Sequence, residues 1–162
     1  MPETMRVLFV CLGNICRSPL AEVVVRDRAL ARGLAGHFDF ASAGTGDWHI
    51  GKGADPRSAD TAQRYGHDLS QHRARQITAS TIADWQWFVA MDADNHADLL
   101  AMGAPAARVL MMRRFEAGDG PIPDVPDPYY GGPQGFDRVH AMLADNADPM
   151  LDFLLAEGIR AP

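Results

Sequence analysis

The chain opens with an apolar segment that runs directly into a cysteine-containing loop and then into a helix. Residues 7–10 are all apolar, which predicts a buried parallel strand over about 6–10. The loop that follows has the pattern C-x5-R-S, with five residues between Cys11 and Arg17. Ser18 and Pro19 then predict the N-cap and first position of a helix that ends near residue 32. Strand, loop and helix in this order place the loop on a helix N-terminus.

This loop combines groups that bind and attack a phosphate. Backbone N–H groups and the positive end of a helix dipole bind anions, and here they favour a thiolate at Cys11. The Ser18 hydroxyl can stabilise that thiolate, and Arg17 offers a fork of donors that matches a tetrahedral oxyanion. We therefore interpret the loop as a nucleophilic phosphate site.

Other interpretations of the cysteines have less support. A cysteine at a strand end is often only a small buried hydrophobe. The two cysteines would need histidines to complete a zinc site, but no two histidines have zinc-ligand spacing. Walker and dinucleotide glycine motifs are also lacking. We expect neither a metal nor a cofactor.

Length and composition indicate an ordinary globular protein. With 162 residues, 47% apolar and 22% charged, the chain fits a single domain over 1–162 with a sizeable core. A net charge of −6 argues against a nucleic-acid partner. No segment has membrane-spanning length, and no signal-peptide pattern is visible. Two cysteines in one loop suit a reducing compartment, so we predict a cytoplasmic protein and leave unconventional secretion open.

Strand and helix patterns alternate along the chain. This alternation predicts an α/β fold with a four-stranded parallel sheet, helices on both faces and the phosphate-binding loop after the first strand. Ligands bind at the carboxyl ends of such strands, where Cys11 and Ser42 would approach one crevice. The later predicted elements are strands at 38–42, 87–91 and 108–112, and helices at 56–65, near Ser80, at 92–102 and at 136–156, the last with a kink or break at Pro149.

A long Gly/Pro-rich loop over residues 116–135 carries a second candidate group. Asp127 stands between two prolines, which restrict the backbone on both sides. Loops of this length are usually functional or disordered, and two adjacent tyrosines favour order. Phosphoryl transfer to a thiolate needs a proton for the departing oxygen. Asp127 is the candidate general acid and Asp124 the second choice, although Asp127 could instead only cap a turn.

Together these segments resemble the low-molecular-weight protein tyrosine phosphatases. The loop CLGNICRSPLAE at 11–22 matches that family's signature. Other matches follow in the same order along nearly the whole chain, at 42–45, 47–48, 55–57, 72–76, 91–95 and 127–130.

The resemblance implies a two-step hydrolysis of phosphotyrosine in a protein substrate. Cys11 would attack phosphorus to give a phosphocysteine, and Asp127 would protonate the phenolate and then activate water. Arg17 and the loop would bind the phosphoryl oxygens, so phosphate and similar oxyanions would inhibit. The other residues of this phosphate-binding loop are Leu12, Gly13, Asn14, Ile15, Cys16 and Ser18.

The resemblance also assigns supporting roles. Asn14 would hold the loop in shape together with Ser42 and His72, and asparagine tolerates left-handed backbone. The pattern alone would make His72 an exposed loop histidine. Cys16 would form a reversible disulfide with Cys11, or else be a packed cysteine without a redox role. A slot for a flat ring would be lined by Leu12, Ile15, Trp48, Tyr129 and Tyr130, unless the aromatic residues only pack the loops.

Three alternative functions stay open at this point. Protein-arginine phosphatases of similar sequence typically carry threonine where this chain has Ile15. Arsenate reductases with this loop need further cysteines downstream, and the chain has none after Cys16. A phosphotyrosine-binding module without turnover would need neither a thiol nor an acid.

Overall fold

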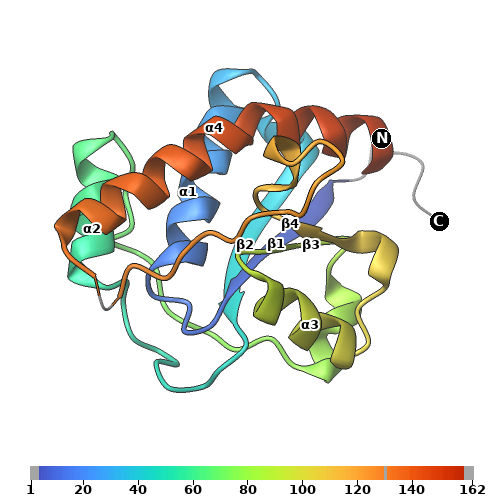
Figure 1. The fold of residues 1–162 in the computed structure, drawn as a ribbon, viewed down its shortest axis with the longest axis horizontal. Coiled ribbons are helices and arrows are strands. Elements are labelled where there is room, and N and C mark those ends of the chain that lie inside the picture. The colour runs from blue at the N-terminus through green and yellow to red at the C-terminus, as the bar shows by residue number, and fades with distance from the viewer. Residues whose placement is uncertain (1–3, 130, 159–162) are drawn as a thin grey trace.

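The centre of the fold is a parallel sheet of four strands. The structure is a computed structural model that describes residues 4–129 and 131–158. The strand order is β2-β1-β3-β4 (Figure 1), and every pairing is parallel. The predicted sheet is therefore confirmed, with β1 in its interior. The strands are β1 (Met5–Cys11), β2 (Phe38–Gly44), β3 (Trp87–Ala90) and β4 (Val109–Met111).

Helices cover both faces of this sheet, as the alternation predicts. Alternate residues of a strand point to opposite faces, so β1 serves two cores. Val7 and Phe9 pack in the cluster that includes α1 and α4, whereas Leu8 and Val10 pack in the cluster that includes α3. Figure 1 shows α1 and α4 on one side of the sheet and α3 on the other. The α-helices are α1 (Arg17–Ala31), α2 (Pro56–Arg64), α3 (Ala93–Ala101) and α4 (Pro133–Gly158).

Helix α1 starts earlier than the sequence pattern predicts. Its N-cap is Cys16, whose side chain makes no capping hydrogen bond. Ser18, the predicted N-cap, lies inside the first turn, and its hydroxyl is 3.0 Å from the Cys11 sulfur. The N-cap assignment was wrong because this hydroxyl interacts with the loop sulfur rather than with the helix N–H groups. Pro19 fits in the first turn, where an N–H would have no helical partner.

Helix α4 continues through Pro149, so the predicted break is wrong. The helix runs over 26 residues and begins three residues before the predicted start at 136. Pro149 itself is exposed, while Leu143, Met150 and Leu154 are fully buried in the cluster with α1. This apolar packing holds the helix together across the missing hydrogen bond. Among the described residues, no helix has both the length and the apolar character needed to cross a membrane.

The core position of Leu143 gives a test of the packing between α4 and α1. Leu143→Ala should lower the free energy of unfolding by about 2–5 kcal/mol, because a buried leucine loses its contacts and leaves a cavity. Urea denaturation measures the change. The control is Leu100→Ala on the exposed side of α3, which should cost only about 0.5 kcal/mol. Equal losses for the two variants would contradict the described packing.

Candidate active site

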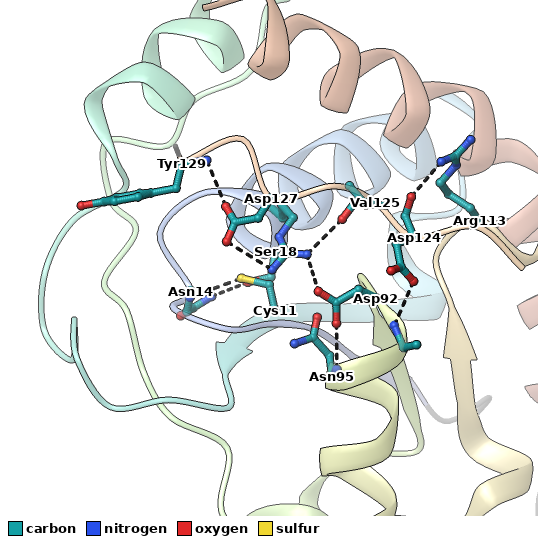
Figure 2. Close-up of polar contacts among 12 residues, drawn as sticks. Cys11, Asn14, Ser18, Asp92, Asn95, Arg113, Asp124, Val125, Asp127 and Tyr129 are labelled. Atoms are coloured by element: carbon teal, nitrogen blue, oxygen red, sulfur yellow. Dashed lines mark hydrogen bonds and ion pairs between the residues drawn. The ribbon is translucent and has the colours of Figure 1, made fainter. Parts of the chain in front are cut away.

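The Cys11 sulfur lies where β1 ends and the loop before α1 begins. Cys11 is the last residue of β1 and is only 2% exposed. Its Sγ accepts the backbone N–H of Asn14 at 3.3 Å and lies 3.0 Å from Ser18 Oγ (Figure 2). The sulfur therefore faces polar groups at the N-terminus of α1, a location that stabilises anions.

The Asn14 side chain fixes the shape of this loop. Asn14 has a φ of 57°, in the left-handed region that asparagine tolerates better than most residues. Its Nδ2 donates to Ser18 Oγ at 2.8 Å and to Ser42 Oγ at 3.0 Å, and its Oδ1 accepts the N–H of Arg75 at 2.9 Å. Since Ser18 accepts from Asn14, its own proton is available for the Cys11 sulfur; the alternative acceptor, the Ala43 carbonyl, is farther away at 3.4 Å.

His72 supports the same residue from the backbone side. Its Nε2 is 2.6 Å from the Asn14 carbonyl oxygen, which can only accept, so Nε2 carries the proton. Burial lowers the pKa of His72 despite this hydrogen bond, and the ring is neutral at neutral pH. The structure thus brings together the three residues that were predicted to support the loop, and His72 is not the exposed histidine that the pattern alone suggested.

The Arg17 guanidinium is held in place before any ligand arrives. It is 3% exposed, and its Nη1 donates to Asp92 Oδ2 at 2.7 Å and to the Val125 carbonyl at 3.0 Å (Figure 2). Burial opposes its charge, but Cys11 and Asp92 together raise the pKa of Arg17 above its ordinary value. Sequence reasoning missed the role of Asp92. Its position two residues after the end of β3, at a carboxyl end of the sheet, was the available signal.

Asp127 reaches the site, and Asp124 does not. Asp127 Oδ2 is 3.7 Å from Arg17 Nη2, and its Oδ1 accepts the N–H of Tyr129 at 3.0 Å (Figure 2). Asp127 therefore both caps a turn and faces the guanidinium, so the two interpretations of this residue are compatible. Asp124 Oδ1 instead accepts the N–H of Ala93 at the start of α3. The Asp127 side chain is 38% exposed, so it can contact both solvent and a bound ligand.

A pocket of about 350 Å³ opens above these groups. Four of the five predicted slot residues line it, and the fifth, Tyr130, lies outside the described residues. His49 is an additional lining residue that the sequence did not indicate. The lining residues are Cys11, Leu12, Gly13, Ile15, Cys16, Arg17, Trp48, His49, Asp127 and Tyr129.

Cys16 shares the pocket but differs electrostatically from a nucleophile. Burial, with Asp55 and Cys11 nearby, raises the pKa of Cys16 far above its ordinary value, so this residue is a thiol. Both cysteines are free in the structure. The reversible disulfide between them stays a prediction.

Arg57 connects the start of α2 to the loop that carries Asp127. Its Nη1 donates to the Tyr129 carbonyl at 2.9 Å, and its guanidinium lies over the Tyr129 and Phe136 rings. Asp55 holds the other side of the guanidinium, with Oδ2 2.9 Å from Nη2. Through its contacts with Tyr129, Arg57 holds the loop around Asp127 against the start of α2.

Gly44 allows β2 to approach the phosphate-binding loop closely. It pairs with Cys11 in the sheet register. A Cβ built on Gly44 would lie 2.7 Å from the Leu12 carbonyl oxygen and 3.2 Å from the Asn14 nitrogen. These are backbone atoms that cannot move aside easily, so a side chain at position 44 would press on the loop itself.

The site combines a buried thiol, a fixed guanidinium and a carboxylate at the carboxyl edge of a parallel sheet. This combination is typical of enzymes that act on phosphate esters through a cysteine. In comparisons with known proteins, residues 6–158 match the family described as low molecular weight phosphotyrosine protein phosphatase. The chain belongs to this family, which confirms the predicted resemblance.

Individual relatives agree with that assignment. The low molecular weight protein-tyrosine-phosphatase of Streptomyces coelicolor is 46% identical over 145 residues, which cover 86% of this chain and 87% of that protein. The low molecular weight protein-tyrosine phosphatase A of Mycobacterium tuberculosis is 43% identical, with coverage of 88% and 87%. The crystal structure of YfkJ from Bacillus subtilis superposes with a TM-score of 0.87 at 35% identity, covering 96% of this chain and 97% of that one.

The neutral state of His72 predicts a specific pH dependence of stability. As the pH falls, His72 is protonated near pH 6.5 in the unfolded chain but only at a lower pH in the folded chain, because burial lowers the pKa of His72 in the folded state. The stability from the neutral ring is therefore fully present above about pH 6.5 and is lost as the pH falls. His72→Gln keeps a donor for the Asn14 carbonyl but cannot titrate.

Free energies of unfolding measured from about pH 7 to about pH 5 should fall less steeply for His72→Gln than for the parent. His140, whose pKa is also lowered by burial, is present in both proteins and cancels in the difference. Parallel pH curves for the parent and the variant would show that His72 is not buried as a neutral base.

Proposed function

We propose that this chain hydrolyses phosphotyrosine monoesters of protein substrates through a phosphocysteine intermediate. The observation that carries the proposal is the convergence of the Cys11 sulfur, the Arg17 guanidinium and the Asp127 carboxylate on one pocket. The protein-tyrosine-phosphatase names of the relatives point to the same activity.

In the first step, the Cys11 thiolate attacks the phosphorus atom. A sulfur–phosphorus bond forms while the bond from phosphorus to the tyrosine oxygen breaks. The protonated Asp127 carboxyl donates its proton to the departing phenolate. Arg17 and the loop N–H groups stabilise the charge on the equatorial oxygens, which is the main requirement for phosphoryl transfer.

In the second step, water replaces the sulfur. The Asp127 carboxylate accepts a proton from water, the new oxygen–phosphorus bond forms, and the sulfur–phosphorus bond breaks to return the thiolate. The Ser18 hydroxyl, 3.0 Å from Sγ, stabilises the sulfur as a leaving group because it can donate to the anion. Inorganic phosphate leaves, and it and similar oxyanions compete with substrate for the same loop.

Burial of Arg17 supports a preorganised role for this residue. Asp92 and the Val125 carbonyl occupy Nη1, which leaves the guanidinium oriented with Nη2 toward Asp127 and the pocket. A guanidinium fixed in this way does not have to reorganise when the phosphoryl group arrives. The same orientation places the cation close to the oxygen that Asp127 would protonate.

The pocket walls favour an aromatic ester. Trp48 and Tyr129 lie at the pocket, and each favourable ring pair contributes about 0.5–1.5 kcal/mol beyond area burial. A phosphoserine side chain would not span the depth of such a slot. The protein-arginine phosphatase alternative has less support, because this chain has Ile15 where such enzymes typically carry threonine. The solved structure of the YwlE arginine phosphatase is only 24% identical to this chain and indicates the fold alone. The arsenate reductase alternative lacks the further cysteines it needs.

Matched variants of the two loop aspartates test the acid assignment. Asp127→Ala should lower kcat for phosphotyrosine by roughly 10²–10⁴-fold, because the leaving phenolate loses its proton donor. Inhibition by inorganic phosphate should persist or strengthen, since a negative charge near Arg17 is removed. Steady-state kinetics without added metal measure both quantities.

Asp124→Ala is the control, and Cys11→Ser is the inactive reference. Asp124→Ala should keep kcat near the parent value while losing some thermal stability, because Asp124 accepts an N–H at the start of α3. Cys11→Ser should have no measurable turnover. A normal Asp127→Ala enzyme with a defective Asp124→Ala enzyme would transfer the acid role to Asp124.

A further inference from the structure

One wall of the pocket depends on a glycine beneath the Trp48 indole. The six-membered ring of the indole lies over the Cα of Gly46. A Cβ built on Gly46 would overlap Cζ3 and Cε3 of the ring and would lie 2.9 Å from Cη2. The indole therefore occupies the space that a side chain at position 46 would fill. Trp48 is otherwise 64% exposed, so this contact accounts for much of its packing.

Backbone conformation does not explain the glycine at position 46. Gly46 is not among the described glycines with positive φ, whereas Gly51 in the same loop has a φ of 83°. An alanine could adopt the backbone of Gly46 without the strain it would meet at Gly51. The contact with the indole is thus the structural reason for a residue without a side chain.

The backbone of Gly46 is tied directly to the phosphate-binding loop. Its N–H donates to the Leu12 carbonyl at 2.9 Å, and the preceding N–H of Thr45 donates to the Cys11 carbonyl at 2.9 Å. These hydrogen bonds extend the pairing between β1 and β2 past the ends of both strands. The position of the indole is therefore set relative to the atoms that would hold the phosphoryl group.

The imidazole of His49, next to Trp48 in this pocket wall, also packs against a glycine. A Cβ built on Gly13 would lie 3.0 Å from His49 Cδ2, so the imidazole packs against a glycine of the phosphate-binding loop. Trp48 and His49 both line the pocket. This wall thus contains two rings that pack against two glycines: Gly13 belongs to the phosphate-binding loop, and Gly46 is hydrogen-bonded to it.

We propose that Gly46 helps to determine the specificity for aromatic phosphoesters, an inference that rests on the proposed phosphotyrosine hydrolysis. By letting the Trp48 indole lie against it, Gly46 positions one wall of the pocket where the ring of an aromatic phosphoester would bind. A methyl group at position 46 displaces the indole, and the contact between the indole and the substrate ring is lost. The phosphate-binding loop keeps its shape, because the overlapping atoms belong to the indole.

The test compares benzylphosphonate with methylphosphonate, which share the anion and differ in the ring. Calorimetry on the parent protein gives the ratio of the two affinities without any need for turnover. Gly46→Ala should lower this ratio about two- to tenfold, the value of one ring contact, and leave methylphosphonate binding unchanged. Gly53→Ala is the matched control in the same loop, because a Cβ there would meet only ordinary contacts, the nearest at 3.6 Å from an Arg73 nitrogen.

Two further variants separate the indole from the loop. In a Trp48→Ala background, Gly46→Ala has no ring to displace and should leave the ratio unchanged. Gly44→Ala should instead weaken both phosphonates, since its Cβ would press on the loop backbone. An unchanged ratio for Gly46→Ala would overturn the inference, and so would an equal fall without Trp48. Lack of phosphotyrosine turnover by the parent would overturn the proposed function, whereas the binding comparison would still test whether Gly46 positions the Trp48 indole.

Discussion

The whole site depends on the hydrogen bonds that the buried side-chain amide of Asn14 makes. One side chain connects three segments that are distant in sequence: the start of α1 through Ser18, the end of β2 through Ser42, and the segment after α2 through Arg75. His72 adds a fourth contact, to the backbone carbonyl of the same residue. Because these bonds hold a left-handed residue in the middle of the loop, they also determine which N–H groups and which hydroxyl face the Cys11 sulfur.

Sheet topology explains why the remaining groups meet at this place. With β1 between β2 and β3, the carboxyl ends of three adjacent strands lie side by side (Figure 1). Cys11 ends β1, Gly44 ends β2, and Asp92 follows β3 to hold the Arg17 guanidinium. The segment that carries Asp127 then crosses the same edge, anchored where the Val125 carbonyl accepts from Arg17. Nucleophile, cation and carboxylate are thus arranged by one edge of one sheet.

The sheet, the loop and the position of Cys11 were predictable because their signals are local. Apolar runs, turn residues and C-x5-R-S all lie within short stretches of sequence. Ser18 was misassigned because its hydroxyl has a partner, the Cys11 sulfur, whose position no helix rule contains. Pro149 was misassigned because packing of α4 on α1 outweighs the local preference. Asp92 had a signal in its place at a strand end, but its pairing with Arg17 is visible only in the fold. Gly46 could not have been selected, since the sequence does not show that the Trp48 indole lies over it.

In the proposed mechanism, the Cys11 sulfur carries the phosphoryl group between the two steps. Acid quenching of Asp127→Ala during turnover of p-nitrophenyl phosphate, whose leaving group needs little proton donation, allows the intermediate to be trapped and mapped by mass spectrometry. The proposed mechanism predicts one phosphoryl group on Cys11 and none on Cys16. Steady turnover with an unmodified Cys11 at every quench time, or with the phosphoryl group on another residue, would contradict it.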